Sequence, residues 1–132
     1  MRLLSFFSGI LFLSLSSLQA DWTQFRGENS QGISKESVAK EWSAGKGILW
    51  KTELPGKGSS SPIVVGNAVF CTSYTGQASG VERHLFRVDF KTGKIVWQKT
   101  IPVGFPEDEA RGYIMEHGWA SNTPVSDGKN IY

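Results

Sequence analysis

The chain has 132 residues, of which 39% are hydrophobic and 20% charged, and its formal net charge at pH 7 is +2. This composition is typical of a globular protein and excludes a disordered, collagenous or membrane-filling chain. Basic and acidic residues are interspersed, so the sequence builds no one-sided basic surface, and nucleic acid is not an expected partner. Fifteen glycines, five prolines and five tryptophans, with little amphipathic helical pattern, favour an all-β fold of short strands and tight turns.

The first 20 residues have the pattern of a secretory signal peptide. Arg2 gives a positive start, an uncharged apolar run covers residues 3–18, and the small residue Ala20 ends the segment. We predict cleavage after Ala20 and a periplasmic or secreted mature protein. The alternative is an uncleaved anchor helix, but the apolar run is shorter than the roughly 20 residues that span a bilayer. We therefore expect no stable membrane anchor after cleavage.

Two pairs of segments indicate an internal repeat. Residues 48–55 and 95–102 share Ile, Trp and Pro in register, at an offset of 47 residues. Residues 62–70 and 124–132 match at an offset of 62 residues, so the second copy carries a 15-residue insertion ahead of this segment. A period near 47 residues, with β-branched runs and turn glycines, matches one four-stranded propeller blade.

The elements of the first unit can be placed along the chain. The sequence predicts strands over residues 61–65, 68–73, 84–89 and 95–100. Gly66-Asn67 supplies the tight turn of a β-hairpin between the first two strands. Residues 74–82 are interpreted as a polar loop, and Ser34 as the cap of a short helical turn through residues 38–41.

The chain has a single cysteine, Cys71, which cannot form an internal disulfide. It lies in a strand-like run, where a thiol most often acts as a small buried apolar group rather than a reactive or metal-binding one. The two histidines, His84 and His117, are too scattered to suggest a zinc site with it. We therefore expect no metal site.

The turn before the fourth strand carries a motif whose residues have recognisable structural roles. Gly93 can adopt the left-handed conformation that closes a tight turn, and Asp89 can accept N–H bonds from that turn. Trp97 then presents a flat indole that can pack between neighbouring blades, with its N–H available to a backbone carbonyl. We expect structural rather than catalytic roles for Asp89, Thr92, Gly93, Lys94 and Trp97.

This motif resembles the tryptophan-docking repeat of pyrroloquinoline-quinone-like (quinoprotein alcohol dehydrogenase-like) β-propellers. Residues 21–27, 57–62 and 121–128 also look like the start of exported bacterial members of that family, and the resemblance covers essentially all of residues 21–132. It implies a propeller of about eight four-stranded blades, or roughly 360 residues. Residues 21–132 are then expected to hold the first one to two blades, as an N-terminal fragment of a longer protein.

The insertion region, residues 103–121, carries carboxylates, an imidazole and aromatic rings, and two interpretations of it stay open. In the first interpretation, Tyr113 and Trp119 pack back on the blade and the rest of the segment is a solvated loop. Otherwise the loop lines a pocket in which Arg111 and His117 bind an anionic or polar ligand and Trp119 is a stacking platform. The sequence does not identify that ligand, so the cofactor is unknown and no catalytic residue is assigned.

The resemblance implies two functions. The first is a non-catalytic binding or assembly scaffold that acts with other exported or envelope proteins. The second is the N-terminal portion of a quinone-dependent alcohol or sugar dehydrogenase, in which calcium beside the quinone polarises it. Adjacent cysteines, which the alcohol dehydrogenases of that group use, do not occur, nor does an assignable calcium-ligating set. The sequence therefore favours the scaffold, and pyrroloquinoline quinone with calcium belongs to the second hypothesis only.

Overall fold

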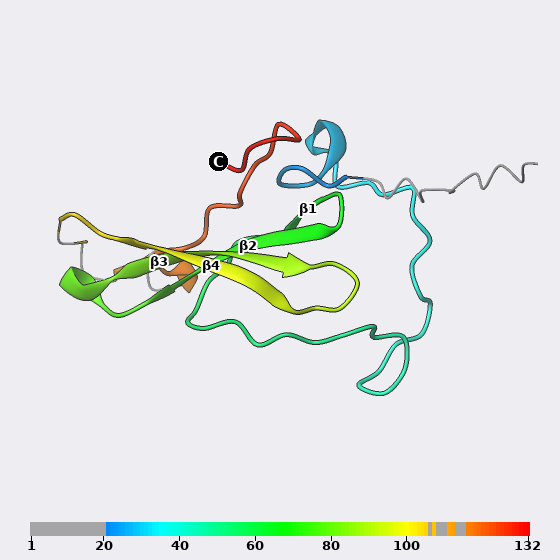
Figure 1. Ribbon diagram of the computed structural model, residues 1–132, viewed down its shortest axis with the longest axis horizontal. Helices are drawn as coiled ribbons and strands as arrows, with labels where there is room; N and C mark the ends of the chain where they lie inside the picture. Colours follow the sequence, from blue (N-terminus) through cyan, green and yellow to red (C-terminus); the bar gives the residue numbers. More distant parts are fainter. Residues whose placement is uncertain (1–20, 106, 108–110, 113–115) are drawn as a thin grey trace, which may run out of the picture.

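The computed structural model describes residues 21–105, 107, 111–112 and 116–132. Within them the chain forms one open four-stranded antiparallel sheet in the order β1-β2-β3-β4 (Figure 1). The strands are β1 (Ile63–Val65), β2 (Ala68–Thr75), β3 (Glu82–Asp89) and β4 (Ile95–Pro102), with 3-10 turns η1 (Glu28–Ser30) and η2 (Ala78–Gly80). The all-β prediction is confirmed. The predicted signal peptide, with its cleavage after Ala20, lies outside the described residues.

All four predicted strands are present, but the connection between β2 and β3 is shorter than expected. The sequence predicted a loop over residues 74–82, whereas both strands extend into it and Thr75 pairs with Glu82. The predicted Gly66-Asn67 turn joins β1 to β2, as Val65 pairs with Ala68. Strand ends were misplaced because cross-strand pairing, and not local composition, sets them.

The predicted helical turn after Ser34 is wrong. Residues 34–41 contain no helix and are exposed throughout. The Ser34 hydroxyl oxygen instead accepts the Glu36 N–H at 3.1 Å. Such a local side-chain bond competes with helix formation, and a short segment without a buried face has nothing to offset the cost of nucleation.

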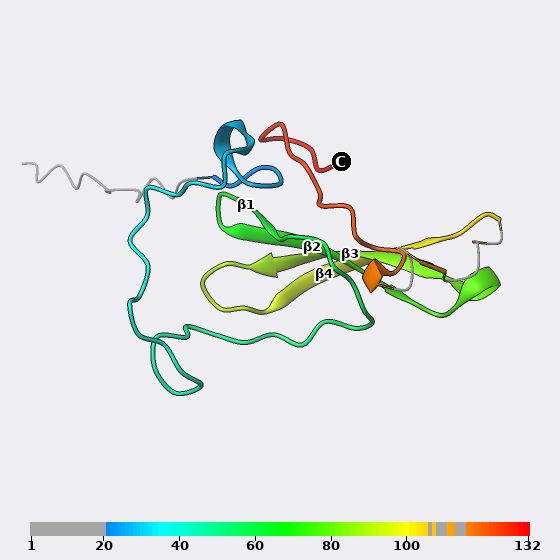
Figure 2. The same cartoon turned by 180° about the vertical axis from the view of Figure 1, so that it is seen from behind.

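Both faces of the sheet are covered. Successive residues of a strand point to opposite faces, and the neighbours Phe70 and Cys71 belong to different buried clusters. One face, called here the Trp97 face, carries Ile63, Phe70, Leu85 and Trp97, with Ile131 packed against it. The other, the Trp50 face, carries Cys71, Phe86 and Val88, covered by Trp50 and Leu54. The two covering segments lie on opposite sides of the sheet in both views (Figures 1 and 2).

Trp50 is docked on the turn between β3 and β4. Its indole N–H donates to the Phe90 carbonyl oxygen at 2.8 Å, and its ring lies against Gly93, where φ is 70°. A Cβ at Gly93 would stand 2.6 Å from the indole Cδ2 atom, so the turn needs glycine for its backbone angle and for this contact. The Thr52 hydroxyl donates to the Gly93 carbonyl oxygen beside it. This contact fixes residues 50–54 against the sheet.

The last residues form a C-terminal hairpin, which lies beside the β1–β2 hairpin. Val125 and Tyr132 exchange two backbone hydrogen bonds, of 3.0 and 2.8 Å. The N-terminal segment joins the two hairpins: Trp22 exchanges hydrogen bonds of 2.8 and 2.9 Å with Val64, and the Thr23 carbonyl accepts the Ser126 N–H at 2.8 Å. Residues 22–23 therefore form a strap from the edge of β1 to the C-terminal hairpin.

We predict that Gly93→Ala destabilises the fold more than Gly66→Ala. Both positions have positive φ, of 70° and 53°, so each alanine incurs a left-handed backbone cost of roughly 1–2 kcal/mol. Only at Gly93 does the new Cβ also collide with the Trp50 ring, whereas nothing lies within 4 Å at Gly66. This overpacking adds about 1–3 kcal/mol. Urea unfolding measures both variants, and equal free energies of unfolding would contradict the docking contact.

Candidate functional site

The end of the insertion lies against the Trp97 face and closes a pocket there. The pocket has a volume of about 250 Å³, and we call it the insertion pocket. Its lining includes Thr72, Arg83, Leu85 and Ile101 from the sheet, Trp119 and Ala120 from the insertion, and Pro124 and Tyr132 from the C-terminal hairpin. The walls are largely apolar, with a few polar groups, as in many small-ligand sites.

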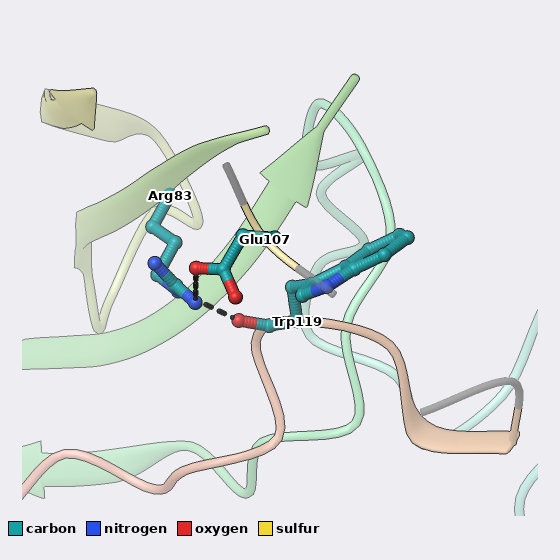
Figure 3. A network of polar contacts seen from close by, with 3 residues as sticks. All are labelled: Arg83, Glu107 and Trp119. Carbon is teal, nitrogen blue, oxygen red and sulfur yellow. Dashed lines mark hydrogen bonds and ion pairs between the residues drawn. The ribbon is translucent and has the colours of Figure 1, made fainter. Parts of the chain in front are cut away.

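Arg83 ties the insertion to the sheet (Figure 3). Its Nε donates to the Trp119 carbonyl oxygen at 2.9 Å, and a terminal nitrogen forms an ion pair with the Glu107 carboxylate. The Glu107 side chain is only 15% exposed and that of Arg83 40%, so water screens the pair incompletely. The planar guanidinium can serve both partners at once because its donors point in different directions.

Trp119 packs on the sheet and also lines the insertion pocket. Its ring meets Tyr74 edge-on, with centroids 5.2 Å apart and an interplanar angle of 80°. The indole Nε1 is buried and has no hydrogen-bond partner among the described residues. An unpaired buried donor costs roughly 1–3 kcal/mol, so an acceptor reaching this atom would bind favourably. Trp119 thus has features of both interpretations that the sequence left open.

Of the three loop candidates, Trp119 lines the insertion pocket. Among the described residues that line the insertion pocket, Trp119 is present, while Arg111 and His117 are not. His117 lies at the foot of the insertion, where its carbonyl oxygen accepts the Ser59 hydroxyl at 3.2 Å. Arg111 is exposed, and Tyr113 lies outside the described residues. Binding of an anionic or polar ligand by these side chains stays a prediction.

Asp89 is held by the turn that it opens. Its Oδ1 accepts both the hydroxyl and the N–H of Thr92 at 2.8 Å, and the Lys91 N–H at 3.1 Å. Its Oδ2 accepts a hydrogen bond from the Asn67 side-chain amide at 2.8 Å, which links this turn to the β1–β2 hairpin. The Thr92 hydroxyl, and then the Thr92 N–H, lower the pKa of the Asp89 carboxyl below its usual value. Its backbone N–H bonds the Lys94 carbonyl oxygen at 2.8 Å.

Sequence reasoning missed the role of His84. This residue is 4% exposed on the Trp50 face, with Nε2 2.9 Å from the Thr75 hydroxyl and Nδ1 2.9 Å from the Thr100 hydroxyl. The imidazole therefore forms a polar crosslink between β2, β3 and β4. Its partners could not have been found from composition, because only the register brings Thr100 opposite His84.

Cys71 is buried on the same face, at 8% exposure, as predicted. Burial raises the pKa of its thiol, which disfavours the reactive thiolate. In the part of the chain that the structure describes, no three His, Cys, Asp or Glu side chains gather as a metal site. Nor does any helix there have the length and apolarity to span a bilayer.

In comparisons with family models, with curated proteins and with solved structures, no match to this chain was found. The resemblance to quinoprotein-like propellers therefore rests on the sequence motifs alone and stays an expectation.

We predict that Arg83→Lys lowers stability by roughly 1 kcal/mol, because lysine keeps the charge but cannot reach Trp119 and Glu107 together. Arg87→Lys is the matched control, since Arg87 lies on the same strand and face and has no side-chain hydrogen bond to a described residue. Chemical unfolding measures both. An equal loss at the two positions would show that the Arg83 contacts contribute nothing specific.

We predict that the Asp127 carboxyl group, in the C-terminal hairpin, stays ionised at unusually low pH. Its Oδ1 accepts the N–H groups of Asn130 and Lys129 at 2.7 and 2.8 Å, and these bonds lower its pKa to about 2. The unfolded value is about 3.9, so the stabilising contribution is present above that pH and is lost as the pH falls through about 2. Carboxyl-carbon NMR should give this midpoint, whereas a midpoint near the unfolded value would contradict the turn geometry.

Proposed function

We propose that this chain belongs to an exported, pyrroloquinoline-quinone-like β-propeller and works as a non-catalytic scaffold that binds or assembles other exported or envelope proteins. The observation that carries the proposal is the docking of Trp50 on the Phe90–Gly93 turn. This contact joins one segment of the expected repeat to the sheet of the next. Propellers are built from such contacts between successive blades.

The cover on the two faces of the sheet follows the expected repeat. Trp50 shares a cluster with Val69 on one face, and Trp97 shares a cluster with Ile131 on the other. Trp97 follows Trp50 by 47 residues, and Ile131 follows Val69 by 62, which are the two offsets found in the sequence. Corresponding pairs of residues thus pack against the core of each face, which supports an array in which each unit packs against the next.

Backbone contacts support the same arrangement. The Ser61 N–H donates to the Thr123 hydroxyl at 3.1 Å, and these two positions are 62 residues apart. The strap of residues 22–23 bonds Val64 and Ser126, which are separated by the same interval. Contact between corresponding positions is expected where neighbouring copies are related by rotation about a nearby axis, as in the radial repetition of a propeller.

Several polar side chains form structural contacts within the protein, which supports a scaffold. The Asp89 carboxylate accepts bonds from its own turn, the His84 ring is held by two hydroxyls, and Arg83 joins the insertion to the sheet. General acid–base catalysis needs a side chain placed to exchange a proton with a substrate. These three side chains instead connect strands, turns and the insertion. Their roles are those of a framework that presents loops to a partner.

The alternative dehydrogenase would need residues that hold a quinone and calcium. Calcium takes about 6–8 oxygen ligands, most of them carboxylate or carbonyl oxygens. Among the described residues, the carboxylates of Asp89 and Asp127 are engaged by their own turns, and no acidic cluster of three gathers. The described residues do not fit such a site, so no catalytic step is assigned to them.

We predict that the full-length protein does not bind pyrroloquinoline quinone in the presence of calcium. Titration followed by tryptophan fluorescence should show no saturable stoichiometric quenching, and added alcohol or glucose should give no dye reduction. A quinoprotein dehydrogenase depleted of its cofactor provides the positive control. Stoichiometric binding that a calcium chelator abolishes, together with dye-coupled alcohol oxidation, would replace the scaffold with the dehydrogenase.

A further inference from the structure

β4 is the last strand of the sheet, and its far edge is open (Figure 1). The strand at the other end, β1, is bonded along its outer edge by Trp22. β4 pairs with β3, and among the described residues no other backbone hydrogen bond or β-bridge reaches residues 95–102. An open edge of this kind is a template for pairing with another chain.

The open edge of β4 is largely apolar. Ile95, Val96 and Ile101 are 39%, 48% and 62% exposed. Soluble proteins commonly block such edges with charged side chains, above all lysine. β4 contains a single charged residue, Lys99, whose Nζ lies 5.6 Å from the centroid of the Trp97 ring. The one charge of the strand thus lies over an indole on its own face, and the edge is left without a charged block.

The sequence of β4 is self-complementary about Gln98. When two identical strands pair antiparallel about a two-fold axis, one residue lies opposite its own copy. With Gln98 in that position, the pairs between the copies are Trp97 with Lys99, Val96 with Thr100, and Ile95 with Ile101. They join a cation to an indole, two β-branched side chains, and two apolar side chains, all of which stabilise a sheet. Centring the pairing on Lys99 would instead place like charges opposite each other.

The middle of β4 is regular enough to accept a second strand. The register shift in the β3–β4 pairing leaves Val96 without a partner on β3, whereas residues 97–102 pair in regular order. Gln98 lies in that regular stretch, and its side-chain amide nitrogen is 3.2 Å from both His84 Nδ1 and the Thr100 hydroxyl. The centre of the self-complementary register is therefore held in place by contacts within one copy.

We propose that the open edge of β4 is a dimer interface, at which two copies of this chain pair antiparallel with Gln98 opposite Gln98. The backbone bonds of the new ladder supply affinity, and the side-chain pairs around Gln98 select the second copy as the partner. One pair of short strands is a small interface, so the dimer forms reversibly and its fraction rises with protein concentration. This inference concerns self-association and does not depend on the proposed scaffold function.

Sedimentation equilibrium of the full-length protein tests the dimer, with Ile101→Lys as the disrupting variant. We expect this variant to weaken dimerisation at least tenfold, because the two-fold axis places a lysine opposite Ile95 twice in each dimer. Ile33→Lys is the matched control, since Ile33 is similarly exposed, at 68%, and lies outside the sheet; it should leave dimerisation unchanged. A monomer at every concentration up to about 1 mM, or equal weakening by the two variants, would overturn the inference.

Cysteine crosslinking tests the register separately. Under mild oxidation, we expect Gln98→Cys to form a disulfide-linked dimer at least tenfold faster than Lys99→Cys. Residues directly opposite have Cβ atoms about 4.5–5.5 Å apart and diagonal ones about 7–8 Å, whereas a disulfide needs roughly 3.5–4.5 Å. The native Cys71 is buried, so it contributes little background. Equal rates for the two variants, or faster crosslinking at position 99, would contradict the pairing about Gln98.

Discussion

The docking of Trp50 on the β3–β4 turn is the contact on which the rest of the structure depends. It joins two parts of the chain that are 40 residues apart, through one hydrogen bond and the close approach of an indole to Gly93. Residues 49–54 have no backbone ladder among the described residues, so side-chain contacts hold them in place. The cover over Cys71 and the rest of the Trp50 face follows from this contact.

The strands could be predicted because their signals are local. Gly66-Asn67 between two apolar runs is a hairpin signal that needs no tertiary information, and β1 and β2 meet there. The pairing of Thr75 with Glu82 could not be predicted, because register depends on which side chains share a face. Ser34 shows the reverse error: it has the chemistry of a helix cap, but the residues after it bury no face.

The candidate site was predictable only in part. Trp119 stood out as an aromatic residue within the insertion, and it does line a pocket. Arg83, which positions the Trp119 carbonyl, belongs to no motif, and its partner Glu107 is 24 residues away in the sequence. Such a contact depends on the path of the insertion over the sheet, which neither composition nor spacing encodes. Residues that position a loop are therefore harder to find than residues within a turn.

The two-sided burial of the sheet has a consequence for how stability is distributed. An antiparallel sheet commonly leaves one face in water, whereas here the adjacent residues Phe70 and Cys71 are both buried. Their cover comes from segments that precede and follow the sheet in the chain, through Trp50 on one side and Ile131 on the other. The stability of this sheet therefore depends on segments outside its four strands, because they help to remove the apolar side chains of both faces from water. Weakening the Trp50 contact would therefore be felt first at Cys71, Phe86 and Val88, against which Trp50 packs, rather than in the pairing of the strands.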